Sequence, residues 1–120
     1  MKKILVVDDA ASTRELIGYT LKDAGYDITQ ANDGVEALEV AQNVIFDLVL
    51  TDINMPNMDG ISLVRYLRRL PGYQSTPILL STIESGKSIK VLGKQAGATA
   101  LIIKPMNREV LFKAVKRMLG

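Results

Sequence analysis

The sequence predicts a doubly wound α/β protein, in which a parallel five-stranded sheet carries helices on both faces. Five short apolar runs alternate with five segments of helical periodicity, which is typical of βαβ units with right-handed crossovers. Hydrophobic residues make up 48% of the chain and aromatic residues only 5%, so the expected core is aliphatic, as in buried parallel sheets. The 120 residues suit one domain.

The first strand and helix are predicted from residues 4–25. Residues 4–7 form an unbroken aliphatic run, which predicts a buried strand. In the helix expected at 12–25, Ser12 and Glu15 have the spacing of a capping box, and Gly25 suits the C-terminal end. The apolar side of this helix would consist of Leu16, Ile17, Leu21 and Ala24.

A weaker second strand is expected at 27–31. Asn32 to Gly34 form a turn, and Asp33 precedes Glu36 by three residues, which again suits the start of a helix. The buried side of that helix would carry Val35, Leu38 and Ala41.

The middle of the chain contains two further strands with a helix between them. Residues 48–50 are apolar and lead through Asp52 into a loop rich in Asn, Pro, Asp and Gly. The helix ends at Pro71 and Gly72. Its apolar stripe would contain Leu63, Val64, Leu67 and Leu70, with Arg65, Arg68 and Arg69 outside the stripe. Residues 78–80 predict the fourth strand.

The last third of the chain completes the alternation. Residues 86–96 predict only a marginal helix, because apolar positions are few and Gly93 lies within the segment. Residues 101–103 form the fifth strand, and Asn107 could cap the final helix. The inward side of that helix would carry Val110, Leu111, Ala114, Val115, Met118 and Leu119.

Reactive side chains follow four of the predicted strands. Because the carboxyl ends of parallel strands meet at one edge of the sheet, these side chains are expected to lie together where open α/β sheets bind ligands. They are Asp8, Asp9, Asp52, Thr82 and Lys104. Three neighbouring carboxylates disfavour one another's ionised forms, and a divalent cation relieves this repulsion. With no His or Cys in the chain, oxygen ligands remain, and they select a hard cation such as Mg²⁺.

Phosphoryl transfer to a carboxylate fits this set of side chains. A carboxylate can attack phosphorus and carry the phosphoryl group as an acyl phosphate. Asp52 is the predicted acceptor, while Asp8 and Asp9 would hold the metal ion directly or through water. Lys104 would pair with the phosphoryl oxygens, and Thr82 would hydrogen-bond one of them.

Composition argues against several other functions. The absence of Cys removes disulfides and thiol catalysis, and the absence of His removes imidazole chemistry. A net charge of +2, without aromatic residues interleaved among the basic ones, gives no reason to expect nucleic-acid binding. No apolar run is long enough to span a membrane, and 4–7 is too short for a signal peptide. We therefore expect a soluble cytoplasmic protein.

Five segments, spread over the whole chain, resemble the receiver domains of two-component response regulators. They are V-V-D-D at 6–9, L-V-L-T-D-I-N-M-P-N-M-D-G at 48–60, P-I-L-L-S-T at 77–82, A-G-A at 96–98 and K-P at 104–105. The chain is most similar to CheY-type stand-alone receivers of chemotaxis. The resemblance implies a flavodoxin-like (βα)5 fold with strand order 2-1-3-4-5, a receiver domain at 1–120 without an output domain, and a cis Lys104-Pro105 bond.

The resemblance also implies roles for the site residues. A histidine kinase would phosphorylate Asp52, with Asp9, Asp52 and the backbone carbonyl of Asn54 as Mg²⁺ ligands and Asp8 reaching the ion through water. Glu84 and Asn54 would tune the hydrolysis of the aspartyl phosphate. Such a protein is not an enzyme in its own right, since a kinase supplies the phosphoryl group and only slow auto-dephosphorylation is expected.

Family resemblance further implies a switch. The hydroxyl that matches Thr82 moves toward the phosphoryl group, and an aromatic side chain on the fifth strand turns inward. The face formed by the fourth helix, the fifth strand and the last helix then changes its partners. A downstream protein target is expected there, with the flagellar motor switch as one candidate and a phosphatase as a further partner. Basic side chains on this face either form a solvated surface or dock an acidic partner segment: Lys87, Lys90, Lys94, Lys113, Lys116 and Arg117.

Two positions depart from the family pattern. Ile83 stands where a small residue usually follows the switch hydroxyl, and Leu101 replaces the aromatic residue three positions before Lys104. Leu101 has no ring to exchange between buried and exposed positions, so the sequence does not predict the usual coupling to Thr82. We hypothesise that Ile83 crowds the approach to Asp52 and slows the access of donors, phosphatases or water.

Other functions remain as alternatives. The chain could be a phosphorylation-independent interaction module, or a shuttle that relays phosphate between histidine proteins. A phosphatase of the haloacid dehalogenase type would need D-x-D-x-T where this chain has D-D-A-A-S at 8–12. A flavin-binding protein would need a Ser/Thr-rich phosphate loop after the first strand, where two acids would repel the phosphate.

Overall fold

A computed structural model describes residues 1–120 and confirms the predicted fold. Five parallel strands form one sheet in the order β2-β1-β3-β4-β5. The strands are β1 (Lys3–Val7), β2 (Asp27–Ala31), β3 (Leu48–Asp52), β4 (Ile78–Thr82) and β5 (Ala100–Ile103). The helices are α1 (Ala11–Asp23), α2 (Gly34–Asn43), α3 (Gly60–Arg69), α4 (Lys87–Ala96) and α5 (Arg108–Leu119). No helix is long and apolar enough to cross a membrane.

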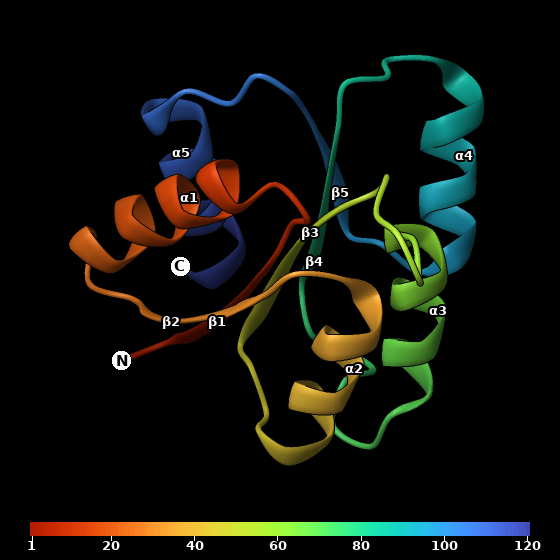
Figure 1. Ribbon diagram of the computed structural model, residues 1–120, viewed down its shortest axis with the longest axis horizontal. Coiled ribbons are helices and arrows are strands. Elements are labelled where there is room, and N and C mark those ends of the chain that lie inside the picture. The colour runs from red at the N-terminus through yellow and green to blue at the C-terminus, as the bar shows by residue number, and fades with distance from the viewer.

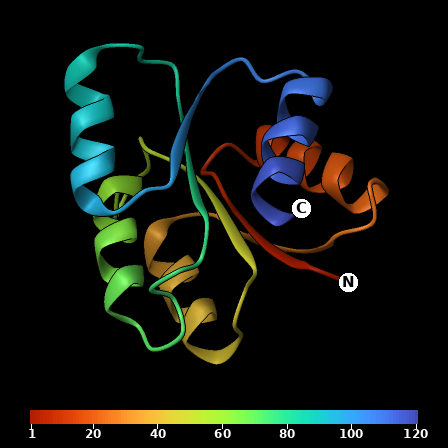
Figure 2. The ribbon, with the colours of Figure 1, turned by 180° about the vertical axis from the view of Figure 1, so that it is seen from behind.

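The helices form two layers around the sheet. Helices α1 and α5 lie on one face, and α2, α3 and α4 lie on the other, as Figures 1 and 2 show from opposite sides. Each face has its own apolar core. Because successive strand residues point to opposite faces, Leu5 and Val7 join the core beneath α2, α3 and α4, while Ile4 and Val6 join the core beneath α1 and α5. This double coverage explains why the strands are continuous apolar runs.

The central strands β3 and β4 are buried along their whole length, which places polar side chains in protected positions. Asp52 is the last residue of β3 and pairs with Ser81 of β4, and Thr82 ends β4 opposite Ile103 of β5. All five strands are parallel, and the carboxyl ends of β3 and β4 point upward in Figure 1. The fold therefore brings the predicted reactive side chains to a single edge of the sheet.

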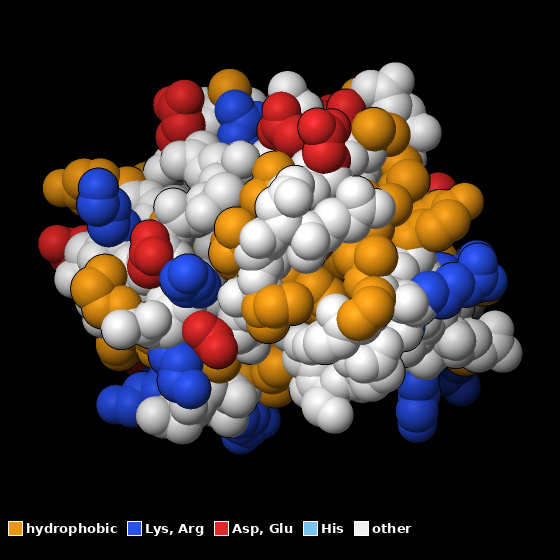
Figure 3. Space-filling model, turned by 90° about the horizontal axis from the view of Figure 1, so that it is seen from below, with side chains coloured by type: hydrophobic (Ala, Val, Ile, Leu, Met, Phe, Trp, Pro, Cys, Tyr) orange, Lys and Arg blue, Asp and Glu red, His pale blue; other side chains and the backbone are white.

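Figure 3 shows the molecule from below, from the end opposite to that edge. Apolar side chains gather in the middle of this face, and Lys and Arg lie mainly toward its two sides.

Helix starts agree with the sequence at two places and differ at one. Asp33 accepts a hydrogen bond from the amide of Glu36, and Asn107 does the same for Val110. The capping box predicted at Ser12 is wrong, because α1 begins one residue earlier and follows Ala10, which provides no side-chain cap. The amide of Ala10 instead donates to Oδ1 of Asp8. A side chain of the site thus organises the start of α1.

Several side chains assigned to helix interiors are exposed. Leu16 is 67% exposed and Val35 is 48% exposed, and Ala24 and Val110 also face solvent. In α1 the sheet-facing side contains Gly18 and Thr20 together with Ile17 and Leu21. Gly18 packs so closely that an added Cβ would lie 3.1 Å from the side-chain nitrogen of Gln30. The predicted stripe was therefore only partly correct, because contact with β2 rotates the buried side of α1 toward its small residues.

The helix expected at 86–96 is present as α4, which has ten residues, and its marginal stability stays a prediction. Gly93, which weakens the helix by propensity, is buried against β4, and a Cβ at this position would lie 3.0 Å from Cδ1 of Leu80. Glycine therefore allows α4 to approach the sheet closely. Tertiary packing, which no local pattern reports, supports this helix.

Candidate functional site

Three carboxylates and one ammonium group meet at the carboxyl edge of the sheet. Asp8 follows β1, Asp52 ends β3, and Lys104 follows β5. The Nζ atom of Lys104 lies 3.0 Å from Oδ2 of Asp8 and 3.3 Å from Oδ1 of Asp52. Side-chain oxygens of Asp8, Asp9 and Asp52 all lie within 4.8 Å of one another. The fold thus assembles four of the five predicted site residues into one cluster.

The two oxygens of Asp52 differ in their surroundings. Oδ1 accepts a hydrogen bond from the amide of Ile53 at 2.9 Å and forms an ion pair with Lys104. Oδ2 has no hydrogen-bond partner in the protein. Every buried side-chain oxygen or nitrogen atom in the structure does have a partner, so Oδ2 is not buried. Oδ2 must therefore be open to solvent. One oxygen fixes the orientation of the carboxylate, and the other is available for reaction.

Asp8 and Asp9 are adjacent in sequence but differ in burial and bonding. Asp8 is buried, and both its oxygens are engaged, Oδ1 by the amide of Ala10 and Oδ2 by Lys104. Asp9 is exposed and has no hydrogen bond or ion pair within the protein. Asp9 is therefore the freer of the two to bind a cation.

Electrostatics at this edge favour a cation. Burial raises the pKa of Asp52 above its ordinary range, and the neighbouring Asp8 raises it further, while Lys104 opposes both effects. Burial alone would lower the pKa of Lys104, but the carboxylates of Asp8 and Asp52 outweigh burial and raise it. Lys104 therefore remains charged and offsets only part of the negative charge. The donor set consists of oxygens, so it fits a hard divalent ion such as Mg²⁺.

Thr82 and Lys104 are joined through their backbones. The amide of Lys104 donates to the carbonyl oxygen of Thr82 at 2.7 Å. The side chain of Thr82 is fully buried, and its hydroxyl accepts a hydrogen bond from the amide of Glu84 at 3.1 Å. Glu84 itself is exposed in the loop after β4. The bond between Lys104 and Pro105 is cis.

The loop after Asp52 folds back tightly against β3. The amide of Gly60 donates to the carbonyl oxygen of Ile53 at 2.8 Å, and a Cβ on Gly60 would collide with the carbonyl oxygen of Asp52. Only glycine permits this approach. Asn54 lies in the exposed part of the loop, two residues after Asp52. The loop is therefore closed at its base, against the backbone of Asp52.

The comparison that decides the family covers nearly the whole chain. A family model described as the response regulator receiver domain matches residues 4–116. The chain belongs to this family of receiver domains.

Individual receivers support a CheY-like assignment. The chemotaxis protein CheY1 of Helicobacter pylori is 38% identical to this chain over 98% of this chain and 97% of the relative. A solved structure of the chemotaxis protein CheY4 of Vibrio cholerae is 44% identical, covers 98% of each chain and superposes with a TM-score of 0.96. The receiver domain of the sensor histidine kinase PA1611 of Pseudomonas aeruginosa is 28% identical over 99% of this chain and 98% of that chain, with a TM-score of 0.92. Its structure has a magnesium ion coordinated in the active site cleft.

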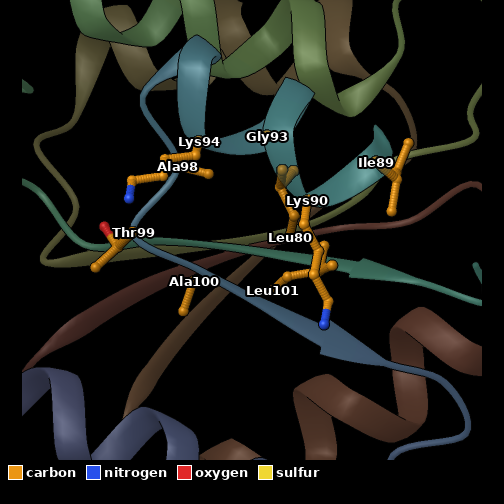
Figure 4. A pocket seen from close by; sticks show the side chains of 9 residues that line it. All are labelled: Leu80, Ile89, Lys90, Gly93, Lys94, Ala98, Thr99, Ala100 and Leu101. Atoms are coloured by element: carbon orange, nitrogen blue, oxygen red, sulfur yellow. The ribbon is translucent and has the colours of Figure 1, made fainter. Parts of the chain in front are cut away.

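The two departures from the receiver pattern occupy different grooves. Leu101 of β5 is half-buried and lies in a groove of about 310 Å³ between β5 and α4. Leu80 of β4 and Gly93 of α4 line the same groove (Figure 4). Lys90 and Lys94 of α4 also line this groove. Ile83 is 75% exposed and lines a larger groove of about 600 Å³ with Leu16 of α1 and with Lys104. Ile83 thus lies beside the site, on the side of α1 and α5.

Sequence patterns predicted no contacts for three polar residues, two of them near the site and one, Arg68, at the opposite edge of the sheet. Arg14 donates from Nη1 to the carbonyl oxygen of Asp8, Asn57 donates to Asp33, and Arg68 donates to the carbonyl oxygen of Gly97. Asn57 is also the only residue other than glycine with a positive φ, at 69°. No spacing pattern marks these contacts, but an Asn between Pro56 and Met58 in a turn-rich loop is a common choice for a left-handed conformation.

Proposed function

We propose that this receiver accepts a phosphoryl group on Asp52 from a histidine kinase in a Mg²⁺-dependent reaction and acts as a response regulator in two-component signalling. The observation that carries the proposal is the placement of Lys104 between Asp8 and Asp52, with Oδ2 of Asp52 left open. The ammonium holds one oxygen of the acceptor while the other faces the approach of a donor.

Four oxygen groups of this chain suit the ion. Asp9, Asp52 and the backbone carbonyl of Asn54 would bind it, and Asp8 would reach it through water. The geometry agrees with this division, because both oxygens of Asp8 are already engaged while Asp9 is free. When bound, Mg²⁺ neutralises negative charge that gathers on the phosphoryl oxygens.

The acceptor reaction follows from the orientation of Asp52. Oδ2 attacks phosphorus and forms an O–P bond, while the P–N bond of the donor phosphohistidine breaks and the imidazole nitrogen keeps the electron pair. Lys104 already stands against the carboxylate and is placed to pair with a phosphoryl oxygen. Thr82 supplies a hydroxyl that could leave the amide of Glu84 and donate to another phosphoryl oxygen.

The chain's own catalytic share is modest: it takes the phosphoryl group from a donor and slowly hydrolyses its own aspartyl phosphate. Water attacks phosphorus and the carboxylate of Asp52 leaves, so no cofactor beyond the metal ion is required. The exposed side chains of Glu84 and Asn54 flank the site and would tune the rate at which water reaches the aspartyl phosphate.

Phosphorylation would be read out on the face formed by α4, β5 and α5. Thr82 links the site to this face, because its carbonyl oxygen accepts the amide of Lys104 at the end of β5. Lysines of α4 and α5 suit an acidic segment of the downstream target. The similarity to chemotaxis proteins makes chemotaxis the proposed setting and the flagellar motor switch a candidate target, with a phosphatase as a further partner.

One observation favours a second candidate function. Leu101 has no aromatic ring to take part in a phosphorylation switch. A receiver that binds its partners without phosphorylation needs no such ring, so Leu101 is compatible with that function. A shuttle that passes phosphate between histidine proteins is a related alternative, since it needs Asp52 chemistry but no output face.

The deciding experiment is intact mass spectrometry after incubation with a small-molecule phosphodonor, with and without Mg²⁺. The parent chain is expected to gain a Mg²⁺-dependent phosphoryl adduct that Asp52→Asn does not gain. A folded parent chain that binds Mg²⁺ but gains no adduct from either the small donor or a cognate kinase would refute the proposal. Partner capture that ignores phosphorylation would favour the interaction module.

A further inference from the structure

The loop between β3 and α3 is held at two separate points. At its base, the amide of Gly60 bonds the carbonyl oxygen of Ile53. At its tip, Nδ2 of Asn57 donates to Oδ2 of Asp33 at 2.8 Å. Asn54 lies between these two points, on the stretch of the loop that they hold.

Asp33 is a firm anchor for the tip of the loop. Its second oxygen, Oδ1, accepts the amide of Glu36 at 2.8 Å and so caps α2, and Glu36 in turn accepts the amide of Asn32. These hydrogen bonds from Glu36 and Asn57 lower the pKa of Asp33, so it is charged at neutral pH. A charged acceptor strengthens the bond from Asn57.

Packing beside this hydrogen bond supports the same contact. Met58 lies directly over Gly34, the first residue of α2, where an added Cβ would come within 2.8 Å of the Met58 side chain and carbonyl oxygen. Asn57 meets this geometry by adopting a positive φ, which Asn tolerates better than most residues. The positive φ of Asn57 costs conformational free energy, and it allows the tip of the loop to pack on the start of α2.

We propose that Asn57 is a positioning residue for the metal ion: through Asp33 it holds the loop so that the carbonyl of Asn54 is ordered before the ion binds. This inference rests on the proposed function, which assigns that carbonyl to Mg²⁺. A ligand on a loop without this tether must be ordered when the ion arrives, and that ordering weakens binding. Asn57 touches neither the ion nor the phosphoryl group in this scheme and acts only through the loop.

The test is Asn57→Gly, which removes the hydrogen bond but keeps the positive φ accessible. Gln74→Gly is the matched control, because Gln74, in the loop before β4, also tethers its loop through the side-chain amide, which donates to the carbonyl oxygens of Arg68 and Leu70 at the end of α3. Both variants exchange an exposed loop amide for glycine. The chain has no Trp whose fluorescence could report Mg²⁺ binding, so the binding is measured by calorimetry. Stability is measured by thermal unfolding without Mg²⁺.

Asn57→Gly is expected to weaken Mg²⁺ binding by about tenfold, the lower end of the effect of removing an outer-shell partner. Phosphorylation by a small donor should slow at low Mg²⁺ and return to the parental rate at saturating Mg²⁺. Gln74→Gly should leave Mg²⁺ affinity unchanged. An Asn57→Gly protein with lower thermal stability but parental Mg²⁺ affinity would overturn the inference and leave the proposed function standing. A parent chain that neither binds Mg²⁺ nor gains phosphate would overturn both.

Discussion

The ammonium of Lys104 lies 3.3 Å from Oδ1 of Asp52, and this contact joins the last strand of the sheet to its centre. The same nitrogen is 3.0 Å from Asp8, so one cation serves two carboxylates. Neither acid has another cationic partner in the protein. The charge balance of the site therefore depends on one side chain, which also helps the amide of Ile53 to orient the carboxylate of Asp52.

Lys104→Met is expected to slow phosphorylation of Asp52 by about 100- to 1000-fold, because the variant removes the donor that would stabilise charge on the phosphoryl oxygens. The rate is measured by intact mass with a small phosphodonor at saturating Mg²⁺. Lys113→Met is the matched control, since Lys113 forms an exposed ion pair with Glu109 at 3.0 Å, one turn earlier on α5. Equal rates for the two variants would contradict the role of Lys104.

Asp52→Asn is expected to raise the melting temperature at pH 7 without Mg²⁺, on the order of a few °C for a domain of this size. Burial raises the folded-state pKa of Asp52 above its ordinary value of 3.8. An acid with a raised folded pKa contributes stability below its unfolded pKa and loses that contribution as pH rises through the folded pKa. The gain from Asn should therefore shrink as pH falls toward 3.8 and below.

The control for this prediction is Asp23→Asn, which removes an acid in an exposed ion pair with Arg108. Such pairs contribute little, so its melting temperature should stay near that of the parent. Thermal unfolding across the pH range checks both variants, and a lower melting temperature for Asp52→Asn at pH 7 would count against the argument from burial.

Arg68→Met is expected to lower the free energy of unfolding by about 2–3 kcal/mol, because three backbone carbonyls lose a charged donor. The guanidinium of Arg68 reaches the carbonyl oxygens of Gly97, Tyr73 and Thr76 at distances from 2.6 to 3.0 Å. Burial lowers the pKa of this guanidinium, which nevertheless stays charged. Urea unfolding measures the loss, and hydrogen exchange should increase at the end of α4.

The neighbouring Arg69 provides the control for Arg68. Arg69 is exposed, and its guanidinium lies 6.0 Å from the ring centre of Tyr66. Arg69→Met should change stability by about 0.5 kcal/mol or less. Similar losses in the two variants would show that charge at the end of α3, rather than the carbonyl contacts, is what matters.

Ile83→Ala is expected to raise the rates at which Asp52 gains and loses phosphate by several-fold, if the exposed side chain beside Lys104 restricts access. Stability should hardly change, because an exposed side chain contributes little to the core. Ile45→Ala, at another exposed apolar position, is the control. Parental rates of both gain and loss in Ile83→Ala would refute the hypothesis.

Much of the fold and the site could be predicted because both follow from local patterns. A strand covered on both faces must be apolar throughout, so runs such as 4–7 were conspicuous in the sequence. The parallel arrangement then required the side chains after each strand to share one edge. Asp52 and Lys104 could be placed together without knowledge of any contact between them.

What could not be predicted depends on contacts between distant segments. The bond from Asn57 to Asp33 spans 24 residues, and that from Arg68 to Gly97 spans 29. Periodicity also overestimated the burial of Leu16, because a helical stripe indicates an apolar side but not how far the sheet extends beneath it. Ser12 resembled a cap, yet Asp8 takes the amide of Ala10 and sets the start of α1 one residue earlier.

The contact between Lys104 and Asp8 spans 96 residues, and this separation bears on how the protein is made. During synthesis, β1 and β3 leave the ribosome long before β5, so the acids exist before the group that balances them. Strand β5 pairs only with β4 and is the last strand of the sheet to be translated. In a nascent chain, Asp8 and Asp52 therefore lack their cationic partner until β5 pairs with β4, and we expect the complete cluster only once this last strand has joined the sheet.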